Sequence, residues 1–291
     1  MIIDIHVHPT FHESKTRSRP ELLTHYGGVD ILKDPSSLDY AARLTSLHYY
    51  HREPVTLTLE DFISQMNEAN IDKAVLLSGS SHAHTRNIGL AEIIDQYPDK
   101  LLGFGGFDVN QGEKAVPDMD DVINELGFKG FKLVSSSLEL KINDKKLYPF
   151  YAKAEELGVP VLIHTGSALI MGLRTKYEHP LLIDDVAFDF PELKIICAHL
   201  GGYELMGCLS MLARHPNVYA DLSFWPLHPY YRDLVPWALL EKLFTDKLLL
   251  GSDYSSGQTP MEAVQAVNSL PIGKRFKEKI LGENAVKILK L

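Results

Sequence analysis

Short apolar segments rich in β-branched residues recur about every 30 residues along the chain, and segments with helical spacing of apolar residues separate most of them. This alternation is typical of parallel βα units, in which each helix returns the chain to the next strand. Strands are predicted at residues 2–7, 73–77, 102–107, 130–134, 159–164, 194–199, 218–222 and 247–252. Eight such units predict an α/β fold of the closed (β/α)8 type, the TIM barrel.

The segments between the strands predict amphipathic helices that cover the barrel. Apolar residues recur at helical spacing in residues 59–69, 87–96, 118–126, 147–157 and 205–214, and residues 276–289 predict a closing helix. Gly127 and Gly158 end two of these segments and are predicted to be helix C-caps.

One domain accounts for the chain length, because a single barrel of this kind takes about 250 residues. We therefore predict one barrel domain over residues 1–291. Residues 9–55 are far longer than an ordinary βα connection and are rich in Tyr, Arg and His. Because such loops surround a barrel's active site, this segment is predicted to cap the site; a surface excursion or an oligomer contact is the alternative.

Composition restricts the classes of partner. The 29 basic and 38 acidic residues give a net charge of −9, which argues against a nucleic-acid surface and favours a small-molecule substrate. No apolar run approaches membrane-spanning length, and the first strand follows Met1 without a basic leader, so we predict a cytoplasmic protein without membrane contact, with a homodimer possible. Cys197 and Cys208 lie in apolar surroundings and are predicted to be buried thiols.

Histidine and aspartate residues stand at the predicted carboxyl ends of several strands. His6 and His8 are two residues apart, so both side chains point to the same side of the first strand and could bind one ion. His164 (VLIHTG), His199 (ICAHLGG) and Asp253 (LLGSDY) end three later strands. Since the carboxyl ends of barrel strands meet at one rim, the five side chains are predicted to converge there.

Imidazoles with one carboxylate suit Zn²⁺, with Fe²⁺, Mn²⁺ or Co²⁺ also possible, and one set of ligands predicts one divalent metal per chain. A metal of this kind lowers the pKa of bound water, and Asp253 would take its proton, with His199 the other catalytic candidate. The sequence therefore predicts a hydrolase of a small amide, lactone or ester. The alternative is that the histidines are hydrogen-bonded core residues and that Asp253 caps a helix.

These motifs, in this order, resemble a known family. IDIHVH, HTG, AHLGG, GSDY and the closing GENAVKIL are similar to the amidohydrolase-related branch, amidohydrolase 2, of the metal-dependent hydrolases, which is related to aminocarboxymuconate semialdehyde decarboxylase. The resemblance implies that His6, His8, His164 and Asp253 bind the metal and that His199 lies just outside it. The branch also contains non-oxidative decarboxylases, so a metal-dependent decarboxylase of a small carboxylic acid is the alternative function.

Further candidates for the rim remain open. Some members of the superfamily hold a second metal through a carboxylated lysine, and Lys132 lies in the matching region. It could instead be a positive charge facing the substrate, or a solvated or salt-bridged lysine. The other rim candidates are His82, His84, Arg52, Arg174, Trp225 and Tyr254, whose alternative is an exposed or merely packed loop residue. Asn284 of GENAVKIL is predicted to have a structural role.

Overall fold

Eight parallel strands form the centre of the protein. The computed structural model describes residues 1–9, 58–79, 83–166, 174–229, 231–254 and 258–291. Its strands pair in chain order: β1 (Ile3–Val7), β2 (Lys73–Leu77), β3 (Leu101–Gly105), β4 (Gly130–Leu133), β5 (Val161–Ile163), β6 (Ile195–Cys197), β7 (Val218–Asp221) and β8 (Leu248–Leu249). Each observed strand overlaps its predicted range, so the predicted barrel is confirmed.

The barrel closes between β1 and the segment after β8. The backbone N–H of Ile5 donates to the carbonyl of Leu250 at 3.0 Å. Val7, two residues further along β1, forms a parallel bridge with Tyr254. These contacts bring the carboxyl end of β1, with His6 and His8, beside the segment after β8, with Asp253. Three of the candidate metal ligands therefore lie on adjacent segments.

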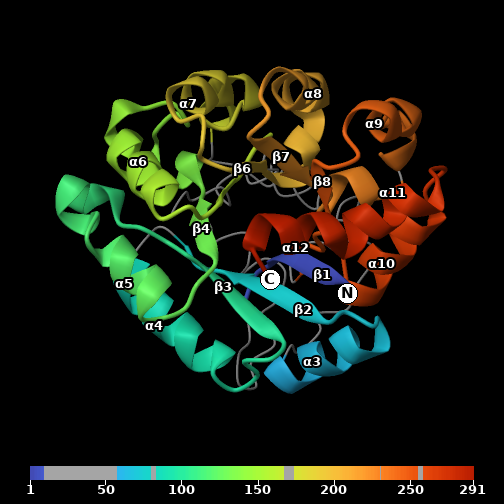
Figure 1. Ribbon diagram of the computed structural model, residues 1–291, viewed down its shortest axis with the longest axis horizontal. Helices are drawn as coiled ribbons and strands as arrows, with labels where there is room; N and C mark the ends of the chain where they lie inside the picture. Colours follow the sequence, from blue (N-terminus) through green and yellow to red (C-terminus); the bar gives the residue numbers. More distant parts are fainter. Residues whose placement is uncertain (10–57, 80–82, 167–173, 230, 255–257) are drawn as a thin grey trace, which may run out of the picture.

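Helices surround the strands, as Figure 1 shows. They are α3 (Leu59–Glu68), α4 (Ala83–Ile94), α5 (Asp118–Asn124), α6 (Tyr148–Glu156), α7 (Ile183–Asp189), α8 (Leu205–Arg214), α9 (Trp237–Leu243), α10 (Pro260–Ser269), α11 (Lys274–Glu278) and α12 (Asn284–Leu289). Gly127 and Gly158 have φ of 68° and 64°, the left-handed conformation expected of C-caps.

The predicted closing helix is present and contains a π-helical turn that the sequence analysis did not predict. A π-helical turn, Lys279–Glu283, separates α11 from α12. Gly282 in this turn packs so closely on the start of the chain that an added Cβ would lie 2.0 Å from the carbonyl oxygen of Met1. The turn therefore allows α12 to approach the amino end of the barrel, where Ile288 and Leu289 join the same buried cluster as Ile3.

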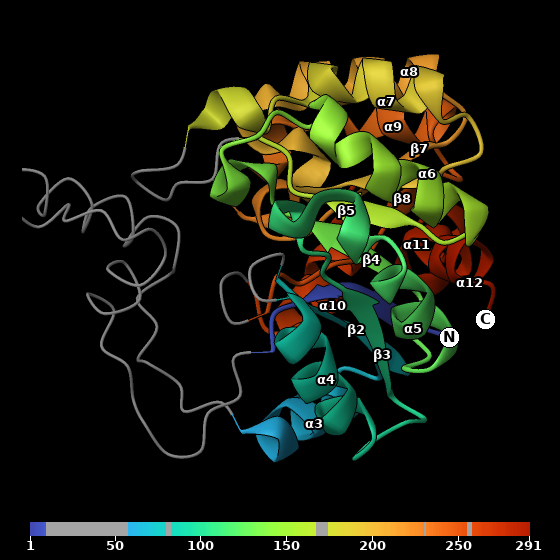
Figure 2. The ribbon, with the colours of Figure 1, turned by 90° about the vertical axis from the view of Figure 1, so that its left-hand side faces the viewer.

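The core has two parts. Inside the barrel, apolar side chains of the strands pack together and against α12, among them Ile5, Val75 and Leu249. Outside it, a larger cluster fills the space between strands and helices. Both termini lie at one end of the barrel in Figure 2, which is the end where β1 begins. Because the strands are parallel, their carboxyl ends form the opposite rim.

Three further predictions concern membrane helices, the cap and the cysteines. No helix among the described residues has both the length and the apolar character needed to cross a membrane. Apart from Pro9, the predicted cap at residues 9–55 lies outside the described residues, as do Arg52 and His82. Cys197 and Cys208 are buried and are not joined in a disulfide, as predicted.

Candidate metal centre

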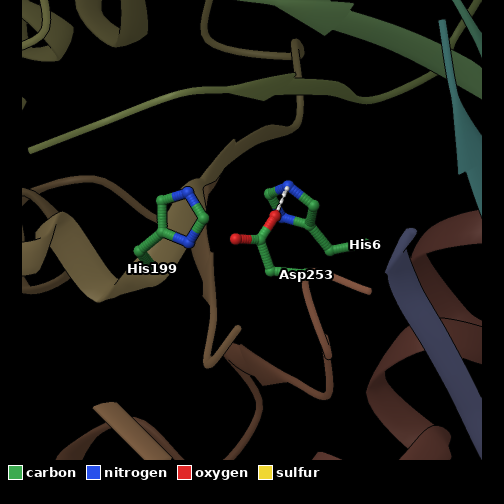
Figure 3. A group of neighbouring side chains, drawn as sticks. All are labelled: His6, His199 and Asp253. Carbon is green, nitrogen blue, oxygen red and sulfur yellow. Dashed lines mark ion pairs between the residues drawn. The ribbon is translucent and has the colours of Figure 1, made fainter. Parts of the chain in front are cut away.

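Three of the predicted site residues meet at the carboxyl rim. His6 comes from β1, His199 from the turn η7 (Ala198–Glu204) after β6, and Asp253 from the segment after β8. One ligand atom from each of the three lies within 4.8 Å of the other two, and all three residues are buried. Figure 3 shows the Asp253 carboxylate between the two imidazole rings. This geometry is suitable for holding a metal ion.

The other two predicted ligands border this group. His8 Nε2 lies 3.0 Å from Oδ1 of Asp253, and the His8 side chain is 30% exposed, so it is the least buried of the five. His164 Nδ1 lies 3.2 Å from His199 Nε2. The barrel therefore brings all five predicted residues together, with His8 and His164 in contact with members of the central group.

Burial keeps the histidines neutral. The pKa of His6 is lowered to about 3, mainly by burial and further by the positive charge of Lys132. Burial also lowers the pKa of His164 and that of His199. At neutral pH each ring therefore has an unprotonated nitrogen, the form that binds a metal or accepts a proton.

Asp253 remains ionised despite its burial. Burial alone would raise its pKa, but the hydrogen bond with His8 and the neighbouring His6 and His199 hold the pKa below its ordinary value. Its backbone has a φ of 55°, a left-handed conformation that is costly outside glycine and is often found at functional sites. Neutral imidazoles beside an ionised carboxylate are the donor set of a divalent metal site, so the residues present fit such an ion.

Lys132 points into the barrel toward the same group. It is buried on β4, and its ammonium donates to His6 Nε2 at 3.3 Å. Burial lowers its pKa to about 8, against the effect of the nearby carboxylates of Asp221, Asp253 and Glu178, which raises it. The alternative of a solvated lysine is therefore excluded, and the Lys132 ammonium lies within the site.

Glycines bring the β5 and β6 loops together and explain the HTG and HLGG patterns. Gly166 has a φ of 87°, and a Cβ added there would lie 2.2 Å from the carbonyl oxygen of Gly201. His199 and Leu200, just before Gly201, also have left-handed backbones. This close approach places His164 beside His199, because each histidine lies two residues before one of the glycines.

Replacing Gly166 by Ala is expected to lower the free energy of unfolding by about 2–3 kcal/mol, since the left-handed backbone and the backbone clash both oppose a methyl group. Urea unfolding measures the change. The control is Gly89→Ala in α4, where a Cβ meets nothing within 4 Å and the free energy of unfolding should rise by about 0.5–1 kcal/mol. Equal stabilities of the two variants would contradict the close approach.

The remaining candidates have other surroundings. The Tyr254 ring packs on Phe62 at 4.6 Å, and its hydroxyl accepts a hydrogen bond from Gln65, so it faces α3. Asn284 donates to backbone carbonyls at the start of β8 and just before it, which agrees with a structural role. Trp225 is buried and stacks on Tyr231 at 4.6 Å, whereas His84 and Arg174 are exposed.

Several buried polar residues around the histidines were missed in the sequence. Asp221, at the end of β7, contacts His6 at 2.8 Å, and Ser223 contacts His199 at 2.8 Å. Glu178 is buried, with its carboxylate 3.8 Å from His164 Nε2. Asp4 accepts hydrogen bonds from the backbone of His6 and Ser252, and burial raises its pKa to about 7. Position at a predicted strand end was a usable signal for Asp221; Glu178 carries no such signal.

Several curated proteins that are similar to the chain are decarboxylases. The amidohydrolase family profile matches residues 3–291. The chain is 23% identical over 235 residues to 2-amino-3-carboxymuconate-6-semialdehyde decarboxylase of Dictyostelium discoideum, covering 70% of this chain and 65% of that protein. It is 27% identical over 185 residues to gamma-resorcylate decarboxylase of Rhodococcus jostii, covering 53% and 54%. Each match thus covers less than two thirds of the relative.

Solved structures share the fold over the whole chain. A TIM-barrel protein of Bordetella bronchiseptica, itself uncharacterized, has a TM-score of 0.77 at 24% identity and covers 99% of this chain and 98% of its own. The 5-carboxyvanillate decarboxylase of Novosphingobium aromaticivorans, complexed with manganese and 4-hydroxy-3-methoxy-5-nitrobenzoic acid, has a TM-score of 0.70 at 20% identity and covers 100% and 96%. At these identities the likeness shows the barrel fold.

The prediction of a hydrolase is contradicted by these comparisons, because the relatives and solved neighbours are mostly decarboxylases. The error has a physical reason. Histidines and an aspartate at the rim of a barrel can hold a metal for either reaction, so the residues that predict the metal do not distinguish attack by water from loss of carbon dioxide.

The family resemblance predicted from the sequence is confirmed by the match over residues 3–291. A divalent metal is supported both by this match and by the buried group of His6, His199 and Asp253. The chain therefore belongs to the amidohydrolase family, in its amidohydrolase-2 branch, and is an enzyme of the amidohydrolase superfamily.

Proposed function

We propose that the protein is a metal-dependent non-oxidative decarboxylase of a small unsaturated or aromatic carboxylic acid. The observation that carries the proposal is the buried group of His6, His199 and Asp253, which combines neutral imidazoles with an ionised carboxylate. Its relatives support the reaction, since they decarboxylate a carboxymuconate semialdehyde and a resorcylate. The proposed substrate class follows from the unsaturation that these two acids share.

The metal would lie among His6, His199 and Asp253, with His8 and His164 completing its ligands. When bound, a divalent metal would supply positive charge that stabilises negative charge developing on the substrate. Zn²⁺ suits the imidazoles, and Mn²⁺, present in the carboxyvanillate decarboxylase complex, suits the carboxylate. We therefore propose one Zn²⁺ or Mn²⁺ ion per chain.

The protein's own residues would deliver the proton that the product needs. Breaking the carbon–carbon bond releases CO2 and leaves an electron pair on carbon, which must take up one proton. Asp253 is the proposed carrier, because its carboxylate is buried and its Oδ1 lies 3.0 Å from Nε2 of the partly exposed His8. His8 gives Asp253 a route to protons from solvent, so the carboxylate can be protonated again after each turnover.

The test is incubation of metal-loaded protein in D2O with a panel of small aromatic and unsaturated carboxylic acids. The expected result is release of CO2 with one deuterium at the carbon that carried the carboxylate. The same panel, extended with esters, lactones and amides, is run in H2¹⁸O. Incorporation of ¹⁸O into an acid product without CO2 release would contradict the proposal and indicate a hydrolase.

A further inference from the structure

Two buried residues connect His6 with His199. Asp221 Oδ2 lies 2.8 Å from His6 Nδ1. The other carboxylate oxygen, Oδ1, accepts hydrogen bonds from the backbone N–H groups of His199 and Ser223, both at 2.9 Å, and from the Ser223 hydroxyl. Both residues are fully buried, and we call this pair the Asp221–Ser223 hub.

The contacts of His6 determine which of its nitrogens carries the proton. Nδ1 faces a carboxylate, which can only accept, so Nδ1 must donate. Nε2 lies 3.3 Å from the ammonium group of Lys132, which can only donate, and 3.4 Å from Oδ1 of Asp253, which can only accept. The neutral ring has one proton, and the shorter contact, from Nδ1 to Asp221, takes it. Nε2 then presents its electron pair to Lys132, which gives the Nδ1–H tautomer.

His199 is fixed in the same way from the other side of the hub. Its Nδ1 lies 3.2 Å from the carbonyl oxygen of Ser223, which can only accept. The Ser223 hydroxyl has a single hydrogen, directed to Asp221 Oδ1, so its oxygen accepts from His199 Nδ1 at 2.8 Å. Nδ1 therefore carries the proton, and Nε2 presents its electron pair toward His164.

We propose that Asp221 and Ser223 are positioning residues that hold His6 and His199 together in the Nδ1–H tautomer. Each Nε2 atom then presents an electron pair, in His6 beside Lys132 and Asp253 and in His199 toward His164. The consequence for catalysis rests on the proposed function, because a metal ligand or a proton acceptor at either Nε2 requires this tautomer. The tautomers themselves are a property of the metal-free protein.

Asp221→Asn tests the hub. The side-chain amide has one oxygen and one NH2 group, and three donors already converge on the position of Oδ1. The amide oxygen is therefore expected there, which turns the NH2 group toward His6 Nδ1. His6 must then accept at Nδ1 and carry its proton on Nε2, the nitrogen that would otherwise bind metal.

The first measurement is ¹⁵N NMR of the imidazole nitrogens in metal-free protein. The wild type is expected to show Nδ1–H for His6 and His199, and Asp221→Asn is expected to show Nε2–H for His6. The second is affinity for Zn²⁺ and Mn²⁺ by competition with a chelator. Asp221→Asn should weaken it by about 10–100-fold, the usual loss when the partner of a metal-binding histidine is removed.

The matched control is Asp184→Asn. Asp184 also contacts a histidine, with His215 Nε2 at 2.6 Å from its carboxylate, but on the outside of the barrel. The control should leave the tautomers of His6 and His199 and the metal affinity at wild-type values. Ser223→Ala removes the hydroxyl that lies 2.8 Å from His199 Nδ1 and 3.1 Å from His6 Nδ1. It keeps Asp221 and the Ser223 carbonyl, so both histidines should keep the Nδ1–H tautomer in that variant.

An Nε2–H tautomer for His6 or His199 in the wild type would overturn the proposal without any variant. A folded Asp221→Asn protein with wild-type tautomers and metal affinity would also overturn it. The expected tautomers and affinities together with no CO2 release from any acid would support the hub and contradict the proposed decarboxylase, so the two failures are distinguishable.

Discussion

Replacing Asp253 by Asn is expected to lower decarboxylation turnover by about 100-fold or more while the protein keeps much of its metal. An amide oxygen can still face a metal, but an amide does not carry a proton at neutral pH. The hydrogen bond from His8 Nε2 to the Asp253 side chain can be kept by the amide oxygen, so the local structure should change little. Steady-state turnover and metal content are measured on the same preparation.

The control for this variant is Asp246→Asn, which changes an exposed aspartate that pairs with Lys279 far from the rim. Its turnover should equal that of the wild type. A folded, metal-loaded Asp253→Asn protein with nearly wild-type turnover would remove Asp253 as the proton carrier. His199, whose neutral ring lies in the same group and presents Nε2 toward His164, would then be the better candidate.

The barrel was predictable because its strands are buried on both faces. Segments such as VLIH and KIICAH are almost uniformly apolar, so they are recognisable without an alternating pattern. The short helices were harder: α7 and α9 have seven residues each, too few for a helical period to stand out. The π-helical turn in the closing helix contains Gly282, which packs on Met1 at the opposite end of the sequence.

The site was predictable to the extent that strand ends determine it. His6, His164, His199 and Asp253 follow from one rule, that carboxyl ends of barrel strands share a rim. Residues that act on them across the barrel do not follow from it. Ser223 contacts His199 and Glu178 lies near His164, and both histidines come from other segments of the chain. No local sequence pattern predicts such contacts.

The reaction was not predictable from these residues. Metal ligands at the rim are compatible with hydrolysis and with decarboxylation, and the difference is expressed in how the substrate carboxylate or carbonyl is held. The predicted cap at residues 9–55, the longest connection in the sequence, is the part of the chain expected to contact the substrate. Two related enzymes therefore can share every metal-binding motif and still differ in the bond they break.

Replacing His6 by Ala is expected to weaken metal binding by more than about 100-fold, whereas His84→Ala should leave it unchanged. His6 is held rigidly, with one nitrogen on Asp221 and the other facing Asp253 and Lys132. His84 lies on the exposed face of α4, so its imidazole is not preorganised for this site. The measurement is metal content after dialysis, and the wild type and His84→Ala should both hold about one metal ion per chain.

Loss of the His6 ring also leaves the buried charges of Asp221 and Lys132 without their shared partner, so the variant should be less stable. Circular dichroism must therefore establish that His6→Ala is folded before its metal content is compared. Affinity near the wild-type value in folded His6→Ala would show that the metal lies elsewhere. Equal losses in His6→Ala and His84→Ala would mean that strand-held and helix-borne imidazoles contribute alike, which contradicts a single site among His6, His199 and Asp253.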